Sequence, residues 1–316
     1  MEQPLVSVVL VTWNSAPYLR RCLEGIARQT HAPVELIAVD NGSSDDSAAL
    51  VAPHAARVIR NDGNRGFAAA VNQGIAAARG ELVQLVNPDC YLAPDYIATL
   101  VRALGESGPR FGAATGKLLR ARGYDIAPAQ GVDSAGMRMT RSGRHLDIDE
   151  DVQERREVFG VSGAAALFRM SFLQDVRIDG EVLDEDFHTY REDADLAWRS
   201  QLLGWRAVCE PAAVAWHVRR VTPEARRALP PDINMHSVKN RFLLRLKNEG
   251  AYLALRNAPF ELARDFVVIA AALTIERTSL PAFAWLWRNR ARVAAKRREI
   301  QRRRVVSDRA LARWFR

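Results

Sequence analysis

The chain has 316 residues, of which 48% are hydrophobic and 26% charged, and its net charge at pH 7 is +8. This composition is ordinary for a globular protein and excludes a wholly disordered or fibrous chain. The three cysteines are far apart and odd in number, which argues against a disulfide framework and favours a reducing compartment. The amino end lacks the pattern of a secretory signal, so we expect a cytoplasmic protein.

Apolar runs rich in β-branched residues alternate with helical stretches over the first 120 residues. The strand-like runs are residues 5–12, 34–40, 81–87 and 111–118, and the helical stretches are residues 18–29 and 67–79. Near-continuous apolar strands separated by helices predict βαβ units around a buried parallel sheet.

The middle of the chain is less regular. Residues 120–157 are rich in Gly, Arg and Asp and predict a long excursion with a small hairpin near 137–145. Residues 158–169 return to buried-strand character, 194–203 predict an amphipathic helix, and 205–209 predict a short closing strand. We therefore expect one α/β domain over residues 1–222 and a helical region over residues 223–316.

The carboxyl end is strongly basic. Residues 288–316 hold twelve Lys/Arg and two Asp/Glu, which implies an anionic partner. Residues 266–275 carry no charge but are too short to span a membrane, which takes about 20 apolar residues. They predict either a buried helix or an interfacial one, and residues 280–287 place aromatic residues beside the basic tail. We expect the tail to bind an anionic membrane surface at the inner face of the cell membrane.

Polar residues follow three of the predicted strands. They are Thr12 and Asn14 after the first strand, Asp40 and Asn41 after the second, and Asn87 and Asp89 after the next. Ligands of parallel sheets bind beyond the carboxyl ends of the strands, so these side chains predict a shared crevice. Asp40 can accept hydrogen bonds from a base or ribose, and Asp89 can bind a divalent cation. The alternative is that they only cap turns and helices.

Further polar residues lie at positions from which they could reach the same crevice. Asn64, Gly66 and Asn72 lie at the entry of a helix, where an anion is favoured. Glu192 and Asp193 stand just before the next predicted helix, where a carboxylate is either a base that stays ionised or a simple cap. His217 can complete a metal site with Asp89, and the following Arg219 can contact a diphosphate.

In order and spacing, these segments resemble the family 2 glycosyltransferases with a GT-A fold, in particular their bacterial rhamnosyltransferase-like branch. The resemblance covers roughly residues 5–220 and is carried by residues 8–15, 39–45, 64–74, 85–89, 161–169 and 183–205. It implies a GT-A (Rossmann-like), mostly parallel sheet flanked by helices, followed by the basic helical extension.

The resemblance also implies roles for these residues. Asp40 would bind the nucleotide near Thr12 and Asn14, and Asp89 would hold Mg²⁺ or Mn²⁺, with His217 near the metal and diphosphate. The other implied donor-binding residues are Asn41, Asn64, Gly66, Asn72, Asn87 and Arg219. Asn87 stands where many relatives carry the first acid of an Asp-x-Asp motif. Related sequences often have Ser after the histidine, whereas here His217 is followed by Arg219, Arg220 and Thr222. Asp193 would be the general base, with Glu192 beside it.

The implied function is inverting transfer of a sugar from a nucleotide-sugar to a hydroxyl of a lipid-linked or cell-envelope glycan. L-Rhamnose from dTDP-rhamnose is favoured by the resemblance, and a UDP-hexose donor is the alternative. A nucleotidyltransferase of the same fold would need a Gly-rich basic loop after the first strand, where the chain reads TWNSAPYLR. A nucleic-acid-binding module is disfavoured because the body shows no recognisable motif for one, so we expect no nucleic-acid partner.

Overall fold

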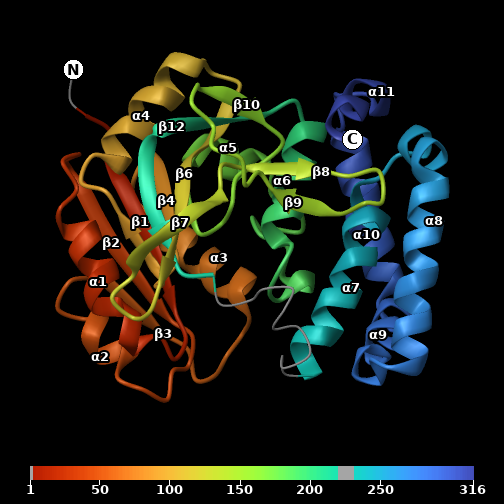
Figure 1. The fold of residues 1–316 in the computed structure, drawn as a ribbon, viewed down its shortest axis with the longest axis horizontal. Helices are drawn as coiled ribbons and strands as arrows, with labels where there is room; N and C mark the ends of the chain where they lie inside the picture. Colours follow the sequence, from red (N-terminus) through yellow and green to blue (C-terminus); the bar gives the residue numbers. More distant parts are fainter. Residues whose placement is uncertain (1–2, 220–230) are drawn as a thin grey trace.

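The computed structural model describes residues 3–219 and 231–316. Its centre is a ten-stranded sheet with helices on both faces, and a layer of carboxyl-terminal helices lies beside it (Figure 1). This architecture confirms the predicted α/β fold with a mostly parallel sheet and a helical carboxyl-terminal region. The boundary expected at residues 222–223 lies outside the described residues.

The main sheet runs in the order β10-β12-β6-β11-β4-β1-β2-β3, with β5 added beside β12 and β7 beside β6. Strands β3, β2, β1 and β4 are mutually parallel, whereas β11 is antiparallel to both of its neighbours. The bounds are β1 (Val6–Thr12), β2 (Val34–Asp40), β3 (Arg57–Arg60), β4 (Leu82–Val86), β5 (Cys90–Leu92), β6 (Phe111–Arg122), β7 (Ala127–Ser134), β8 (Met137–Met139), β9 (His145–Asp147), β10 (Arg156–Val158), β11 (Ala165–Arg169) and β12 (Arg206–His217).

The helices form two layers on the sheet and a third layer beyond it. Their bounds are α1 (Ala16–Ala27), α2 (Ser47–Val51), α3 (Phe67–Ala77), α4 (Tyr96–Ser107), α5 (Met170–Asp175), α6 (Glu192–Leu202), α7 (Pro231–Asn248), α8 (Ala251–Thr274), α9 (Pro281–Arg288), α10 (Arg290–Arg303) and α11 (Asp308–Leu311), with 3₁₀ turns η1 (Glu185–Phe187), η3 (Arg277–Ser279) and η4 (Ala312–Trp314). Helices α1 and α4 pack on one face of the sheet, and α3, α5 and α6 pack on the other.

A third core cluster joins α6 to the carboxyl-terminal helices. Trp198 of α6 is fully buried, and its ring lies 6.5 Å from that of Phe159 and 5.0 Å from that of Phe315. Leu243 of α7 and Val293 of α10 belong to the same cluster. The carboxyl-terminal region is therefore packed on the α/β body through a shared apolar core.

Several expected elements differ from those observed. Strand β3 was missed because it has only four residues at the edge of the sheet, two apolar residues flanked by Arg57 and Arg60. The expected strand 158–169 is split into the end of β10 and β11, and the expected strand 205–209 extends to His217 across a register shift. Helix α6 begins at Glu192, so Glu192 and Asp193 lie in its first turn rather than before it.

Candidate functional site

The carboxyl ends of β1 and β2 form one wall of the site. Thr12 pairs with Asp40 in the strand register, and its hydroxyl donates to the Asp40 carboxylate over 3.0 Å. The Ser43 amide donates to the other Asp40 oxygen, 3.2 Å away. Asn14 has a positive φ of 48°, and its side-chain oxygen accepts from the amide of Ser44. The two neighbouring strand ends thus bring Thr12, Asn14 and Asp40 together.

Asn41 organises the loop that enters α3. Its side-chain nitrogen donates to the Asn64 side chain and to the Gly66 carbonyl, while its oxygen accepts from the Arg65 amide. Gly66 has φ +89°, and a Cβ atom there would lie 2.4 Å from Nδ1 of His188. Only glycine therefore permits this close approach between the start of α3 and the segment that leads into α6.

Asn72 of α3 is used to hold another part of the chain. Its amide nitrogen donates to the Leu183 carbonyl over 2.8 Å, and its oxygen accepts from the Leu183 amide over 2.9 Å. Through these two hydrogen bonds, Asn72 holds the acidic segment that begins at Leu183 and precedes α6. The structure does not show it contacting the polar ends of β1 and β2.

Asp89 and His217 meet across the sheet, as β5 and β12 pair beside them. His217 Nε2 lies 3.4 Å from an Asp89 oxygen, and His217 Nδ1 lies 2.8 Å from Asp133. Arg219 also donates to Asp133, over 2.7 Å, and reaches Asp147 over 2.7 Å. Both carboxylates that hold Arg219 lie in the irregular excursion, and the sequence analysis did not identify either.

Without a bound cation, the electrostatics of this group favour a charged imidazole, so His217 would have to lose its Nε2 proton before that nitrogen could bind a metal. Burial opposes protonation of His217, but its hydrogen bonds to Asp133 and Asp89 outweigh burial and raise its pKa to about 9. Burial likewise works against ionisation of Asp133, yet His217 and Arg219 hold its pKa below the usual value. Asp133 thus orients His217 and Arg219 as an ionised carboxylate.

The donor set at this point fits a hard divalent cation. Asp89 presents a carboxylate beside the imidazole of His217, and Asp133 holds the other imidazole nitrogen, as outer carboxylates do for metal-bound histidines. In the described ranges 3–219 and 231–316, no group of three or more His, Cys, Asp or Glu side chains is placed to hold a metal. Two protein ligands suit Mg²⁺ or Mn²⁺ when phosphate oxygens and water complete the shell.

Asp193 is the ionisable group at the start of α6. The amides of Ala194 and Gly163 donate to its two oxygens over 2.8 and 3.3 Å. Burial and the charge of Asp147 nevertheless raise its pKa to about 6. Its side chain borders a small apolar cavity of about 20 Å³ lined by residues such as Phe67, which explains the cost of its charge.

Glu192 differs from its neighbour. It is buried, one of its carboxylate oxygens has no partner among the described residues, and burial together with Asp193 raises its pKa well above the usual value. Two negative charges on adjacent carboxylates repel each other, so Asp193, the less buried of the two, loses its proton before Glu192 does. The pair therefore offers a single carboxylate base at neutral pH.

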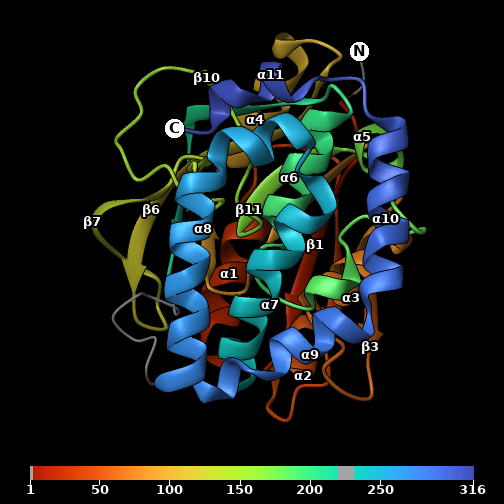
Figure 2. The same cartoon turned by 90° about the vertical axis from the view of Figure 1, so that its right-hand side faces the viewer.

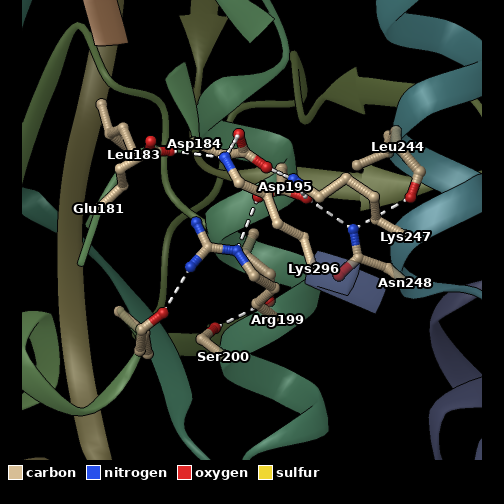
Figure 3. A network of polar contacts seen from close by, with 12 residues as sticks. Glu181, Leu183, Asp184, Asp195, Arg199, Ser200, Leu244, Lys247, Asn248 and Lys296 are labelled. Atoms are coloured by element: carbon tan, nitrogen blue, oxygen red, sulfur yellow. Dashed lines mark hydrogen bonds and ion pairs between the residues drawn. The ribbon is translucent and has the colours of Figure 1, made fainter. Parts of the chain in front are cut away.

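A buried ionic network holds the segment that carries this base (Figure 3). Lys296 of α10 lies 2.8 Å from both Glu181 and Asp184, and Lys247 of α7 also pairs with Asp184. Asp195 accepts from Arg199 and from Asn248 over 2.7 Å each. The carboxyl-terminal helices thus supply the cations that balance an acidic segment of the α/β body.

Helix α7 also fixes the backbone just before the base. The side-chain nitrogen of Asn240 lies 2.9, 2.8 and 2.7 Å from the carbonyl oxygens of Phe187, Thr189 and Tyr190. His188, Tyr190 and Arg191 all have positive φ, a conformation that non-glycine residues rarely adopt. Such a run needs support from its surroundings, and Asn240 provides it. No local sequence signal could have linked a helix near residue 240 to this loop.

The chain has relatives among known proteins. The model of glycosyl transferase family 2 matches residues 7–177. The putative glycosyltransferase EpsH of Bacillus subtilis is 36% identical over 111 residues, which cover 34% of this chain and 32% of that protein. The N-acetylglucosaminyl-diphospho-decaprenol L-rhamnosyltransferase of Mycobacterium tuberculosis is 31% identical over 245 residues, which cover 67% of this chain and 76% of the relative. The chain thus spans only about a third of the length of EpsH but most of the rhamnosyltransferase.

Solved structures share the fold at low sequence identity. The mannosyltransferase PcManGT from Pyrobaculum calidifontis, in complex with GDP-Man and Mn²⁺, has a TM-score of 0.55 and 23% identity, covering 96% of this chain and 86% of that one. GalNAc-T7 with UDP, GalNAc and Mn²⁺ has a TM-score of 0.62 and 16% identity, covering 77% and 48%. The fold, the polar strand ends and the family match over more than half of the sequence agree: this chain belongs to glycosyl transferase family 2.

Proposed function

We propose that the protein is a nucleotide-sugar-dependent glycosyltransferase that acts with inversion, with Asp193 as the base. The observation that carries this proposal is the half-buried Asp193 carboxylate, which two amides hold and whose pKa of about 6 leaves it ionised at neutral pH. A base must be deprotonated at the working pH yet basic enough to take a proton, and this carboxylate meets both needs.

The reaction follows from these positions. Asp193 takes the proton of an acceptor hydroxyl, and the oxygen attacks the anomeric carbon from the face opposite the nucleotide. The bond between that carbon and the diphosphate breaks, and the diphosphate keeps the electron pair. Thr12 and Asp40 would hold the base or ribose of the donor. Mg²⁺ or Mn²⁺ held by Asp89 and His217 would offset the charge that grows on the diphosphate.

We further propose a hexose donor, with L-rhamnose from dTDP-rhamnose as the first candidate, and a lipid-linked or cell-envelope glycan as acceptor. Support comes from the Mycobacterium tuberculosis relative, whose name gives both an L-rhamnosyl group and a diphospho-decaprenol acceptor. The same name supports a hydroxyl of a lipid-linked sugar as the nucleophile. Family membership alone does not specify the donor sugar or the acceptor.

The experiment is a panel of nucleotide-sugars, with binding measured by calorimetry and donor hydrolysis measured in Mg²⁺, Mn²⁺ or EDTA. We expect tightest binding for dTDP-rhamnose and loss of that binding in EDTA. A preference for a UDP-hexose would keep the reaction and reject rhamnose. Failure of every donor to bind, with and without metal, would reject the transferase proposal itself.

Asp89 provides the variant that tests the proposed metal role. We expect Asp89→Ala to weaken donor binding in Mn²⁺ to the level that the unchanged protein shows in EDTA. Asp149→Ala is the matched control, because Asp149 is an exposed acid in the excursion. Equal donor affinities for Asp89→Ala and the unchanged protein in Mn²⁺ would remove Asp89 from the site.

A further inference from the structure

Helix α8 turns a stripe of large apolar side chains outward, unlike an ordinary surface helix. Leu255, Leu262, Phe266 and Leu273 recur at helical spacing on one side, and their exposed fractions are 81%, 68%, 74% and 57%. The side that packs on the protein buries the polar Asn257 and Glu261 together with Leu253 and Ala272. A surface helix normally turns its apolar stripe inward, so this outward stripe needs another explanation.

The inner face of α8 is held by charge. Arg245 of α7 lies 3.0 Å from Glu261 and also pairs with Asp265. These ion pairs leave no freedom for the helix to rotate its apolar stripe into the core. Figure 2 shows α8 beside α7 on this side of the molecule, and in Figure 1 α8 lies farther from the sheet than α7.

The apolar surface continues past the end of α8. Ile275, Leu280 and Trp287 are 79%, 37% and 69% exposed. Among residues 251–291, the exposed charged side chains are Arg277, Arg288 and Arg290. The guanidinium of Arg290 lies 4.4 Å from the centre of the Trp287 ring. The charged side chains that are exposed beside this broad apolar face, within residues 251–291, are therefore all cations.

We propose that the outward face of α8 and α9 is a docking surface for an anionic lipid bilayer, on which the two helices lie without crossing it. Apolar side chains would enter the acyl boundary, with Trp287 and the three arginines at the headgroups. No single helix among the described residues passes as a membrane span by length and hydropathy, although α8 together with residues 277–288 passes as a pair bent by 109°. The ion pairs on the inner face of α8 favour a helix that lies on the surface.

The charge distribution selects lipid over a second copy of the chain. A symmetric dimer would place the same patch against itself and bring two sets of arginines into one interface, with no exposed acid among residues 251–291 to balance them. The inner leaflet carries the opposite charge. In Figure 1 the chain enters β1 from the top, so the parallel strands end at the bottom, where α9 and the end of α8 also lie.

This surface includes Arg288 and Arg290 at the start of the basic tail, and it adds the apolar side of α8 and α9 to the contact expected from the sequence. Much of the charge of α10 is already paired within the protein, as Arg292 with Asp186 and Lys296 with Asp184 show. Arg303, at the end of the same helix, pairs with Asp175. The proposal does not depend on which sugar the site transfers.

The test is sedimentation of the full chain with vesicles of phosphatidylglycerol or of phosphatidylcholine. We expect binding to the phosphatidylglycerol vesicles that weakens with salt. Leu262→Glu/Leu273→Glu should lower the partition coefficient at least about tenfold, and Leu50→Glu, an exposed leucine on α2, should leave it unchanged. Arg288→Gln/Arg290→Gln should lower it roughly tenfold or more, whereas Arg57→Gln/Arg102→Gln removes the same charge elsewhere and should have little effect.

Two results would overturn the proposal. One is a chain that stays in the supernatant with phosphatidylglycerol vesicles at low salt. The other is a dimer in sedimentation equilibrium that the Leu262→Glu/Leu273→Glu variant dissociates, since the face would then join two copies. Donor hydrolysis without vesicles should be the same in all these variants, so failure of the docking proposal is separate from failure of the proposed reaction.

Discussion

Asp193 lies in the first turn of α6 with its charge supported by amides and opposed by its apolar surroundings. We expect Asp193→Asn to lower turnover by about 10²–10⁴-fold, because the amide cannot accept the proton. Donor affinity should stay within about twofold, since the proposed donor contacts lie on β1 and β2 and at Asp89 and His217. Single-turnover kinetics beside donor calorimetry give both quantities. Unchanged turnover would mean that another group is the base.

The pKa of Asp193 also sets a pH dependence. Burial and Asp147 raise this pKa to about 6, above the usual value of a carboxylate. The base works only when it is deprotonated, so turnover should rise with pH, reach half its maximum near 6 and level off above about 7. A rate profile at saturating donor measures this limb. If the residual turnover of Asp193→Asn still rose with pH with the same midpoint, the pH dependence would belong to another group.

Asp133 contacts His217, and in the proposed site it would act through that histidine rather than on the donor. Because outer carboxylates orient metal-bound histidines, we expect Asp133→Asn to weaken Mn²⁺-dependent donor binding by about 10–100-fold. Binding in EDTA should change little, which separates this effect from a general loss of structure. Asp149→Asn serves as the control. Equal loss with and without metal would indicate that Asp133 only supports the fold.

At the scale of elements, the sequence predicted the strands and the polar residues at their ends, because both are encoded by neighbouring residues. The strands that end in Thr12, Asp40 and Val86 are short apolar runs, and the polar residues beyond them stand out in the sequence. The partners of the acidic segment were not predictable in this way. Lys247 and Lys296 are single lysines in helical stretches, and only tertiary packing places both beside Asp184.

The direction in which the apolar stripe of α8 faces could not be predicted from the sequence either. The periodicity of its apolar residues was compatible with a buried helix and with an interfacial one. Exposure of Leu262 and Phe266 excludes the buried helix, and burial of Glu261 on the opposite side depends on its ion pair with Arg245 of α7.

The network between α10 and the acidic segment yields a stability prediction. Lys296→Met would leave buried carboxylates, Asp184 and its neighbour Asp186, with less positive charge near them. Removing one partner from a buried ion pair costs about 3–5 kcal/mol, so we expect a loss of that size in the free energy of unfolding. Urea denaturation measures it against Arg298→Met, an exposed residue of the same helix. A cost equal to that of the control would show that Lys247 alone balances the network.

At the scale of the whole molecule, the α/β body and the carboxyl-terminal helices share one core and one ionic network. Phe315, next to the last residue, is 1% exposed and lies against Trp198 of α6. Deleting residues 289–316 would therefore remove part of the core and the cations that hold the segment before Asp193. We expect the shortened chain to lose cooperative unfolding as well as donor hydrolysis.

Calorimetry and near-ultraviolet circular dichroism of the full and shortened chains test this coupling. The full chain should unfold in one transition, with calorimetric and van't Hoff enthalpies equal, because neither part retains a complete core without the other. Phe315→Ala is the milder variant and should cost about 3–5 kcal/mol while preserving the single transition. A shortened chain that unfolds cooperatively and still hydrolyses donor would show that the α/β body is an independent domain, and the helices would then serve attachment alone.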